Sequence, residues 1–260
     1  MKNKTVLITG GASGLGFELA KLFAADGYSL VLVSRNGSHL SSAKIELSNK
    51  YKISVEIIVA DLTNCQAVNN VFPSLENKGI KIDILVNNAG FGLLGSFVNL
   101  DLQKQLAIIE LDIKALVNLT YQFLGQAPDN SKILNISSMA AFQPGPNMNV
   151  YYAAKAFVSS FSEALAEELV ERKIIVTALC PGPIDTNFWK VSSPGRENIA
   201  GTTALARLTP DFVARVGYQG LMRGRRVVIP GILNKFLAVI VKFVPRSLVT
   251  KGVKWLNSRI

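Results

Sequence analysis

Tyr151 and Lys155 lie four residues apart in the alanine-rich stretch "NVYYAAKAF", residues 149–157. Side chains at that spacing share one face of a helix, whereas Tyr152 is expected to point elsewhere. An ammonium group near a phenol, whose ordinary pKa is about 10, would bring that pKa toward neutrality and make the phenol a general acid or base. An isolated pair of this kind is more often a surface lysine lying along a tyrosine ring, so the pair alone leaves both interpretations open.

A glycine-rich stretch, "TGGASGLG" from Thr9 to Gly16, stands between a strand pattern and a helix pattern. Such a turn lets the backbone approach a pyrophosphate, and the N-terminus of the next helix offers free N–H groups and a partial positive charge. A tight turn without a ligand also uses glycines, but the position between strand and helix favours a dinucleotide site. The residues predicted to form that site are Gly10, Ser13, Gly14, Leu15 and Gly16.

Strand and helix patterns alternate along the whole chain. The predicted strands cover residues 4–10, 28–35, 53–62, 82–90, 131–138 and 173–182. The predicted helices cover residues 13–27, 39–50, 65–75, 103–124 and 150–172. The strands are continuous apolar runs, which is typical of a parallel sheet buried on both faces. This pattern predicts an α/β fold with a doubly wound parallel sheet in a single domain at residues 1–230, followed by a C-terminal helical extension at residues 231–260.

Four motifs together resemble the short-chain dehydrogenase/reductase family over nearly all of residues 4–230. They are the glycine motif, "NNAG" at residues 87–90, Ser138 thirteen residues before Tyr151 with its Lys155, and the turn of Pro181 and Gly182. The resemblance implies a Rossmann fold and an oxidoreductase that moves a hydride between a nicotinamide and a carbonyl or alcohol carbon. It is therefore the resemblance that makes Tyr151 and Lys155 a catalytic pair.

The resemblance also implies a role for each matching residue. Ser138 would bind the substrate oxygen, Tyr151 would exchange a proton with it, and Lys155 would favour the phenolate and bind the nicotinamide ribose. Asn87 is expected to contact or support the adenosine side of the cofactor, and Asp61 with Leu62 is expected at the adenine. The other implied cofactor contacts are Asn88, Ala89, Gly90, Pro181, Gly182, Ile184 and Thr186.

One position departs from the family pattern. The family's fourth catalytic residue is an asparagine in the long helix, and Asp112 occupies that position here. In the family this residue shapes a helix bend whose carbonyl group binds a water on the lysine. We expect Asp112 mainly to keep the bend, and a carboxylate that offsets the charge of Lys155 is the alternative. Asn118 is out of register and is expected to be structural.

The end of the second strand predicts the cofactor. Ser34 and Arg35 stand where an acidic residue would bind the ribose 2′-OH of NAD. A guanidinium group can bind a 2′-phosphate, and no carboxylate is present there to repel it. The sequence therefore favours NADP(H), with a solvated Arg35 as the alternative.

The substrate is predicted only as a class. Residues 187–209 follow the Pro-Gly turn, contain Phe188 and Trp189, and suit a mobile lid with an apolar inner face. Residues expected to extend that apolar wall are Phe91, Leu93, Leu94, Phe142 and Met148. We expect an apolar carbonyl or secondary alcohol. The alternatives are a catalytically weak NADP-binding regulator and a lipid ketone reductase at a membrane surface.

Composition limits the remaining classes. Cys65, Cys180 and His39 are too few and too scattered for a disulfide framework or a metal site, and His39 is expected to face solvent. The first residues lead directly into a strand, which favours a cytoplasmic protein over an exported one.

The net charge of +10 comes largely from the last third of the chain, where single cations alternate with apolar runs. That pattern favours an amphipathic surface over a nucleic-acid-binding arm. Packing of two terminal helices over the substrate cleft or a dimer partner is expected in a homo-oligomer, and peripheral membrane contact is the alternative.

Overall fold

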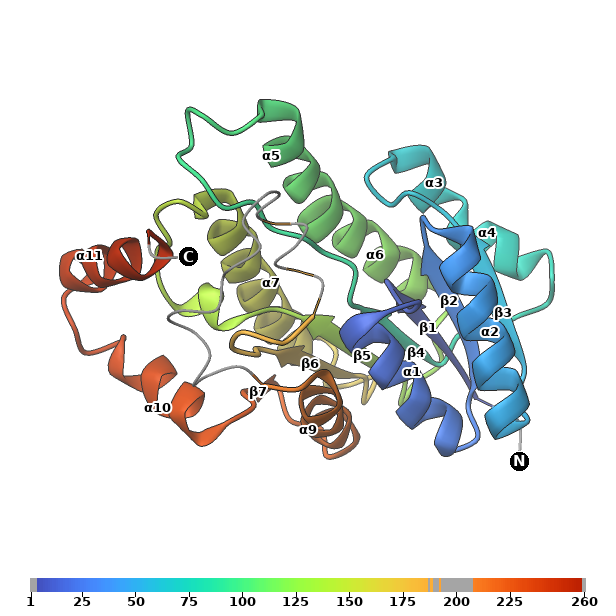
Figure 1. The fold of residues 1–260 in the computed structure, drawn as a ribbon. Coiled ribbons are helices and arrows are strands. Elements are labelled where there is room, and N and C mark those ends of the chain that lie inside the picture. Colours follow the sequence, from blue (N-terminus) through green and yellow to red (C-terminus); the bar gives the residue numbers. More distant parts are fainter. Residues whose placement is uncertain (1–3, 187, 189–191, 193–207, 259–260) are drawn as a thin grey trace.

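The computed structural model describes residues 4–186, 188, 192 and 208–258. Within these residues, seven strands form one parallel sheet in the order β3-β2-β1-β4-β5-β6-β7 (Figure 1). The strands are β1 (Thr5–Thr9), β2 (Ser29–Ser34), β3 (Val55–Val59), β4 (Ile84–Asn87), β5 (Lys132–Ile136), β6 (Ile175–Leu179) and β7 (Val227–Val228). The predicted doubly wound parallel sheet is confirmed. The sequence pattern missed β7, because a strand of two residues is too short to show a period.

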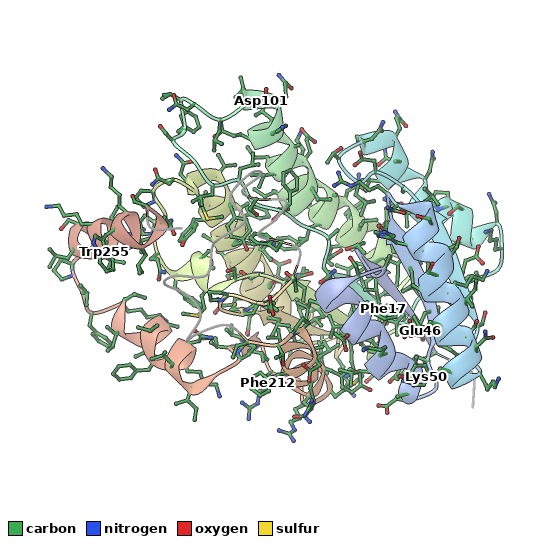
Figure 2. The ribbon with its side chains drawn as sticks, viewed as in Figure 1. Phe17, Glu46, Lys50, Asp101, Phe212 and Trp255 are labelled. Carbon is green, nitrogen blue, oxygen red and sulfur yellow. The ribbon has the colours of Figure 1, made fainter. Side chains whose placement is uncertain are left out.

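Helices cover both faces of the sheet. They are α1 (Gly14–Ala25), α2 (Gly37–Tyr51), α3 (Cys65–Asn69), α4 (Val71–Glu76), α5 (Leu102–Ile109), α6 (Leu116–Gln126), α7 (Asn149–Glu168), α9 (Pro210–Met222), α10 (Ile232–Ile240) and α11 (Arg246–Asn257). The core on one face joins α1, α2 and α9, and the core on the other joins α3, α4, α6 and α7. Glu46 and Lys50 lie on the exposed side of α2, where Figure 2 shows them pointing outward.

The alternation of side chains along β1 shows why the strands read as continuous apolar runs. Val6 and Ile8 belong to the core on one face of the sheet, and Leu7 between them belongs to the core on the other. Successive residues of a strand point to opposite faces, so both sets must be apolar when both faces are covered. β1 pairs with β2 on one side and β4 on the other, and the chain crosses over at this point. Ligands of doubly wound sheets bind outside the carboxyl ends of the strands at such a crossover.

Two predicted helices differ from the structure. The segment at residues 65–75 is divided into α3 and α4. The predicted continuous helix at residues 103–124 is interrupted by a π-helical turn over Glu110–Ala115, between α5 and α6. A single π turn inside an α-helix widens the backbone locally and is frequent at functional sites. Asp112 lies in this π-helical turn, at the position where the sequence analysis expected a helix bend.

The C-terminal segment forms α10 and α11, which Figure 1 shows at the end of the molecule farthest from α2 and β3. No helix among the described residues is both long enough and apolar enough to cross a lipid bilayer.

Candidate active site

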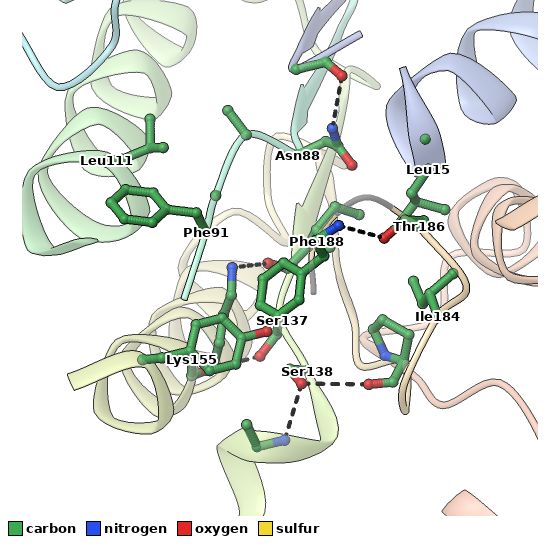
Figure 3. Close-up of a pocket in the computed structure, with 18 of the residues that line it drawn as sticks. Leu15, Asn88, Phe91, Leu111, Ser137, Ser138, Lys155, Ile184, Thr186 and Phe188 are labelled. Carbon is green, nitrogen blue, oxygen red and sulfur yellow. Dashed lines mark hydrogen bonds between the residues drawn. The ribbon is translucent and has the colours of Figure 1, made fainter. Parts of the chain in front are cut away.

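A cavity of about 1090 Å³ opens at the carboxyl ends of the strands (Figure 3). The predicted residues on its surface are Gly10, Ser13, Gly14, Leu15, Ser34, Arg35, Asp61, Leu62, Asn88, Ala89, Gly90, Ser138, Tyr151, Lys155, Pro181, Gly182, Ile184 and Thr186. Gly16 and Asp112 belong to the predicted site but are not part of this surface. Gly10 and Thr186 are more than 170 positions apart in the sequence, and the fold brings both of them to this one cavity.

The glycine turn at the start of α1 has the features of a phosphate-binding site. Gly10 and Gly14 have positive φ angles of 64° and 54°, which glycine adopts without strain. Ser13 precedes the helix, and its side chain makes no capping hydrogen bond. The first N–H groups of α1 are therefore not capped by that side chain and can bind an anion. The turn fits the pyrophosphate of a dinucleotide.

Gly16 contributes through packing rather than by lining the cavity. A methyl group at this position would overlap the carbonyl oxygen of Gly10 and would lie 2.5 Å from Nδ2 of Asn88. The Asn88 amide donates hydrogen bonds to the carbonyl oxygens of Thr9 at 2.9 Å and Gly10 at 3.3 Å. Gly16 therefore allows α1 to approach the turn closely, while Asn88 fixes the backbone of the turn.

Asn87, which was expected to contact or support the adenosine side of the cofactor, does not line the cavity. Its side chain is buried and its Nδ2 donates hydrogen bonds to Oγ1 of Thr120 at 3.1 Å and Oδ1 of Asn135 at 2.9 Å. Asn87 is the last residue of β4, and the alternation of the strand points its side chain into the core rather than toward the cofactor end. It links β4 to β5 and α6, and its neighbour Asn88 faces the cavity.

Ser138, Tyr151 and Lys155 line the same cavity as Arg35, but Ser138 follows β5 whereas Arg35 follows β2, with β1 and β4 between these strands. Ser138 precedes the short 3₁₀ turn Met139–Phe142, and its Oγ accepts a hydrogen bond from the N–H of Ala140 at 3.1 Å. Tyr151 and Lys155 share one face of α7, and Nζ of Lys155 lies 5.6 Å from the centroid of the Tyr151 ring. The Lys155 Nζ also donates to the carbonyl oxygen of Ile136 at 3.1 Å. These contacts orient a hydroxyl, a phenol and an ammonium group toward one space.

Asp112 forms a buried ion pair with the lysine of this group. Its Oδ2 lies 2.9 Å from Nζ of Lys155, and its Oδ1 accepts a hydrogen bond from the N–H of Phe91 at 3.2 Å. Gly90 leaves space for the pair, because a Cβ there would lie 3.0 Å from both carboxylate oxygens. The expectation that Asp112 mainly shapes the bend is therefore incomplete, since the π turn also points its carboxylate at Lys155.

For both Lys155 and Asp112, burial shifts the pKa in one direction and the neighbouring charge shifts it in the other. Burial lowers the pKa of Lys155, but Asp112 and Tyr151 together outweigh it and hold that pKa above its ordinary value. Burial also raises the pKa of the Asp112 carboxyl, against the effect of Lys155.

The Tyr151 phenol differs from the sequence-based expectation. Burial raises its pKa more than Lys155 and the hydrogen bond with Ser138 lower it, and Asp112 raises it further. The pKa of the phenol is therefore raised rather than lowered toward neutrality, because the phenol is desolvated and the charge of Lys155 is offset by a carboxylate beside it.

Tyr152 also corrects an expectation. It lines the cavity and hydrogen-bonds with the side chain of Asn257 in α11, although helical spacing placed it away from the site. The prediction failed because α11 and the cavity lie on adjacent sides of α7. The spacing of residues along one helix does not reveal which elements pack against each of its sides. Phe188 packs beside Tyr151, with the two ring centroids 5.4 Å apart. Figure 3 shows Phe188 in the same cavity as Ser138 and Lys155.

The predicted apolar wall is present only in part. Phe91, Leu93, Met148 and Phe188 line the cavity, whereas Leu94 and Phe142 do not. Lys104 of α5 also lines the cavity, and no sequence motif pointed to that position. Most of the predicted lid at residues 187–209, including Trp189, lies outside the described residues.

A doubly wound sheet with this turn and cavity defines a nucleotide-dependent protein, and comparison with known proteins gives its family. Residues 4–197 match the family model for short chain dehydrogenases, and the chain belongs to that family of oxidoreductases. It is 29% identical over 242 residues to an NADP-dependent 3-hydroxy acid dehydrogenase of Schizosaccharomyces pombe, covering 90% of this chain and 92% of that protein. It is 34% identical over 213 residues to a sulfoacetaldehyde reductase of Chromohalobacter salexigens, covering 80% and 83%.

The fold has a close match among solved structures. A short-chain dehydrogenase from Sphingobium yanoikuyae in complex with NADPH is 29% identical, with a TM-score of 0.78 over 94% of this chain and 97% of that chain. Both the sequence and the arrangement of elements therefore place the chain among short-chain dehydrogenases.

Proposed function

We propose that this protein is an NADPH-dependent reductase of carbonyl compounds, with Ser138, Tyr151 and Lys155 as its catalytic residues. The observation that carries this proposal is that Arg35, which follows β2, lines the same cavity as Ser138, Tyr151 and Lys155, which lie near the end of β5. The glycine turn follows β1, which lies between β2 and β5 in the sheet. That distribution fits an extended dinucleotide with its reactive ring beside the phenol.

Each catalytic residue has a separate task in this proposal. Bound NADPH would supply the hydride that reduces the substrate carbon. Ser138 Oγ donates a hydrogen bond to the substrate oxygen and orients it, and the Tyr151 hydroxyl delivers the proton to that oxygen. Nζ of Lys155 donates one hydrogen bond to the Ile136 carbonyl oxygen and forms an ion pair with Asp112 at 2.9 Å, so this group of three N–H donors can still donate to a ribose hydroxyl. Its charge also stabilises the phenolate that proton transfer leaves behind.

The pKa of Tyr151 supports reduction as the favoured direction. A phenol whose pKa is raised by burial keeps its proton at neutral pH. Carbonyl reduction needs a proton donor, whereas alcohol oxidation needs the phenolate as a proton acceptor. The protonated form that dominates here is the form that reduction uses.

Arg35 supports the choice of NADP(H). It is exposed on the cavity surface directly after β2, and neither Ser34 nor Asn36 carries a negative charge. A guanidinium group at this position can form charge-assisted hydrogen bonds with a 2′-phosphate. The Schizosaccharomyces pombe relative is NADP-dependent, and the solved Sphingobium yanoikuyae structure is a complex with NADPH.

The lining of the cavity supports an apolar carbonyl substrate. Phe91, Leu93, Met148 and Phe188 supply apolar surface beside Tyr151. Lys104 on the same cavity favours a second candidate, a small anionic carbonyl compound, and the sulfoacetaldehyde reductase acts on a compound of that kind.

A substrate screen separates these candidates. Purified protein is incubated with NADPH and a panel of aryl ketones, long-chain ketones, sulfonated aldehydes and keto acids, and the nicotinamide absorbance is followed. We expect turnover of the apolar ketones with NADPH and weaker turnover with NADH. Turnover of anionic aldehydes alone would favour the second candidate, and binding of NADPH without turnover of any compound would contradict the proposed function.

A further inference from the structure

Helix α10 exposes most of its apolar side chains. The exposed set in and just after this helix is Ile232, Leu233, Phe236, Leu237, Val239, Ile240 and Phe243. Ile232 is 86% exposed and Phe243 is 83% exposed. The buried residues of α10 are Asn234 and Ala238, a polar and a small side chain. The usual orientation of an amphipathic helix, with its large apolar residues toward the protein, is reversed here.

Specific contacts fix this orientation. Nδ2 of Asn234 donates a hydrogen bond to the carbonyl oxygen of Pro230 at 2.8 Å. The Asn234 side chain lies directly over Gly182, where a Cβ would be only 2.7 Å from Nδ2. Turning α10 to bury its apolar side would remove the hydrogen bond of Asn234 and this close approach. The exposed apolar side is therefore part of the folded arrangement.

Helix α11 extends the same surface. Val253 and Asn257 attach it to the protein, and Nδ2 of Asn257 donates a hydrogen bond to the carbonyl oxygen of Pro146 at 2.8 Å. Leu248, Trp255 and Leu256 are exposed. Figure 1 places α10 and α11 together at one end of the molecule, and Figure 2 shows Trp255 on α11 at that end. We call the exposed apolar residues of residues 232–256 the terminal surface.

The charge around the terminal surface has one sign. Residues 231–258 contain no aspartate or glutamate. They contain five cations, which are all exposed: Lys235, Lys242, Arg246, Lys251 and Lys254. An exposed apolar helix face edged by lysines is the pattern of helices that lie in the interface of an anionic membrane.

We infer that the terminal surface binds this protein to anionic lipid bilayers, with α10 lying in the interface rather than crossing it. Charge favours lipid over a second copy of the chain, because a two-fold contact through this surface would bring two faces together that each carry five cations and no carboxylate side chain. Anionic headgroups would instead neutralise them while the acyl region covers the apolar side chains. This binding does not depend on the substrate or the cofactor.

Vesicle flotation of the full chain tests the inference. The vesicles are phosphatidylcholine alone, or phosphatidylcholine with about one-third phosphatidylglycerol, at low and high salt. We expect the protein to float with anionic vesicles, to bind neutral vesicles far less, and to lose binding at high salt because salt screens the cations. Replacing Lys235 and Lys242 with glutamine should weaken binding roughly fivefold per charge, since a juxtamembrane cation contributes about 1 kcal/mol.

A pair of matched double variants separates this surface from general stickiness. Phe236→Ser with Phe243→Ser changes two aromatic residues of the terminal surface that are 61% and 83% exposed. Phe97→Ser with Tyr121→Ser changes two aromatic residues outside the terminal surface, which are 53% and 80% exposed. The first variant should stop floating and keep its melting temperature, and the second should float like the parent. Equal flotation of both variants would overturn the inference. Failure of the parent protein to float would also overturn the inference. If light scattering shows a dimer that only the first variant disrupts, the terminal surface instead binds a second copy of the chain.

Discussion

Gly16→Ala should damage the cofactor site through one added methyl group. That methyl would overlap the Gly10 carbonyl oxygen and lie 2.5 Å from Nδ2 of Asn88, so either α1 or the glycine turn must move. Overpacking of this kind costs up to about 3 kcal/mol, at the upper end because the obstacle is backbone. For a chain of this size that cost lowers the melting temperature by about 6–12 °C. NADPH affinity should fall as well, because the turn that moves is the turn expected to bind the pyrophosphate.

Gly125→Ala is the matched control. Gly125 lies in α6, has no atom within 4 Å of an added Cβ, and does not have a positive φ. The same chemical change should therefore stabilise the protein by about 0.5–1 kcal/mol, because alanine favours the helix and restricts the unfolded chain. Thermal melts and NADPH fluorescence titrations of both variants measure these effects. The reasoning is refuted if Gly16→Ala melts and binds NADPH like the parent, or if both variants shift in the same direction.

Three further changes test the charges and contacts around the cavity. Arg35→Asp should reduce the preference for NADPH over NADH by at least about tenfold in kcat/KM, since it removes charge-assisted hydrogen bonds, and an unchanged ratio would show that Arg35 does not reach the 2′-phosphate. Asp112→Asn should move the fall in reduction rate at high pH to lower pH, because the carboxylate raises the pKa of Tyr151 and its loss lets the phenol ionise earlier; an unmoved limb in the pH–rate profile would contradict this. Tyr152→Phe should lower the melting temperature by about 2–4 °C through loss of the hydrogen bond with Asn257, and an unchanged melt would mean that this contact adds nothing.

The sheet could be predicted from sequence because its signal is local. Val6, Leu7 and Ile8 contribute to the cores on both faces of the sheet. Because both faces of a central strand are buried, each such strand must be a continuous apolar run in the sequence. Glycines at the ends of the strands, and helix-type spacing of apolar residues between them, then mark where each element begins and ends. The π turn around Asp112 left no such trace, since widening a helix by one residue changes neither its composition nor its apolar face enough to be read.

The candidate site was predictable where a residue's place follows from its own element, and less so where it depends on another. Gly10 and Ser138 lie at strand ends, which the topology brings to one edge. The contact of Tyr152 is with Asn257 of α11, a helix that begins more than 90 residues later in the sequence. The raised pKa of Tyr151 depends on burial by neighbours such as Phe188. No single-helix pattern contains that information. The Asp112 ion pair likewise required the direction of a side chain from the π turn.

The most direct test of the account compares Tyr151→Phe with the parent protein in two measurements, single-turnover oxidation of NADPH with a reducible ketone and NADPH affinity. Phenylalanine keeps the ring beside Phe188 and Lys155 and removes only the hydroxyl group. The account predicts that the rate falls by about 10²–10⁴-fold while NADPH affinity changes by no more than about twofold, because the proton donor is lost and the cofactor contacts remain. A variant that still reduces the ketone within about tenfold of the parent rate would contradict the claim that Tyr151 donates the proton.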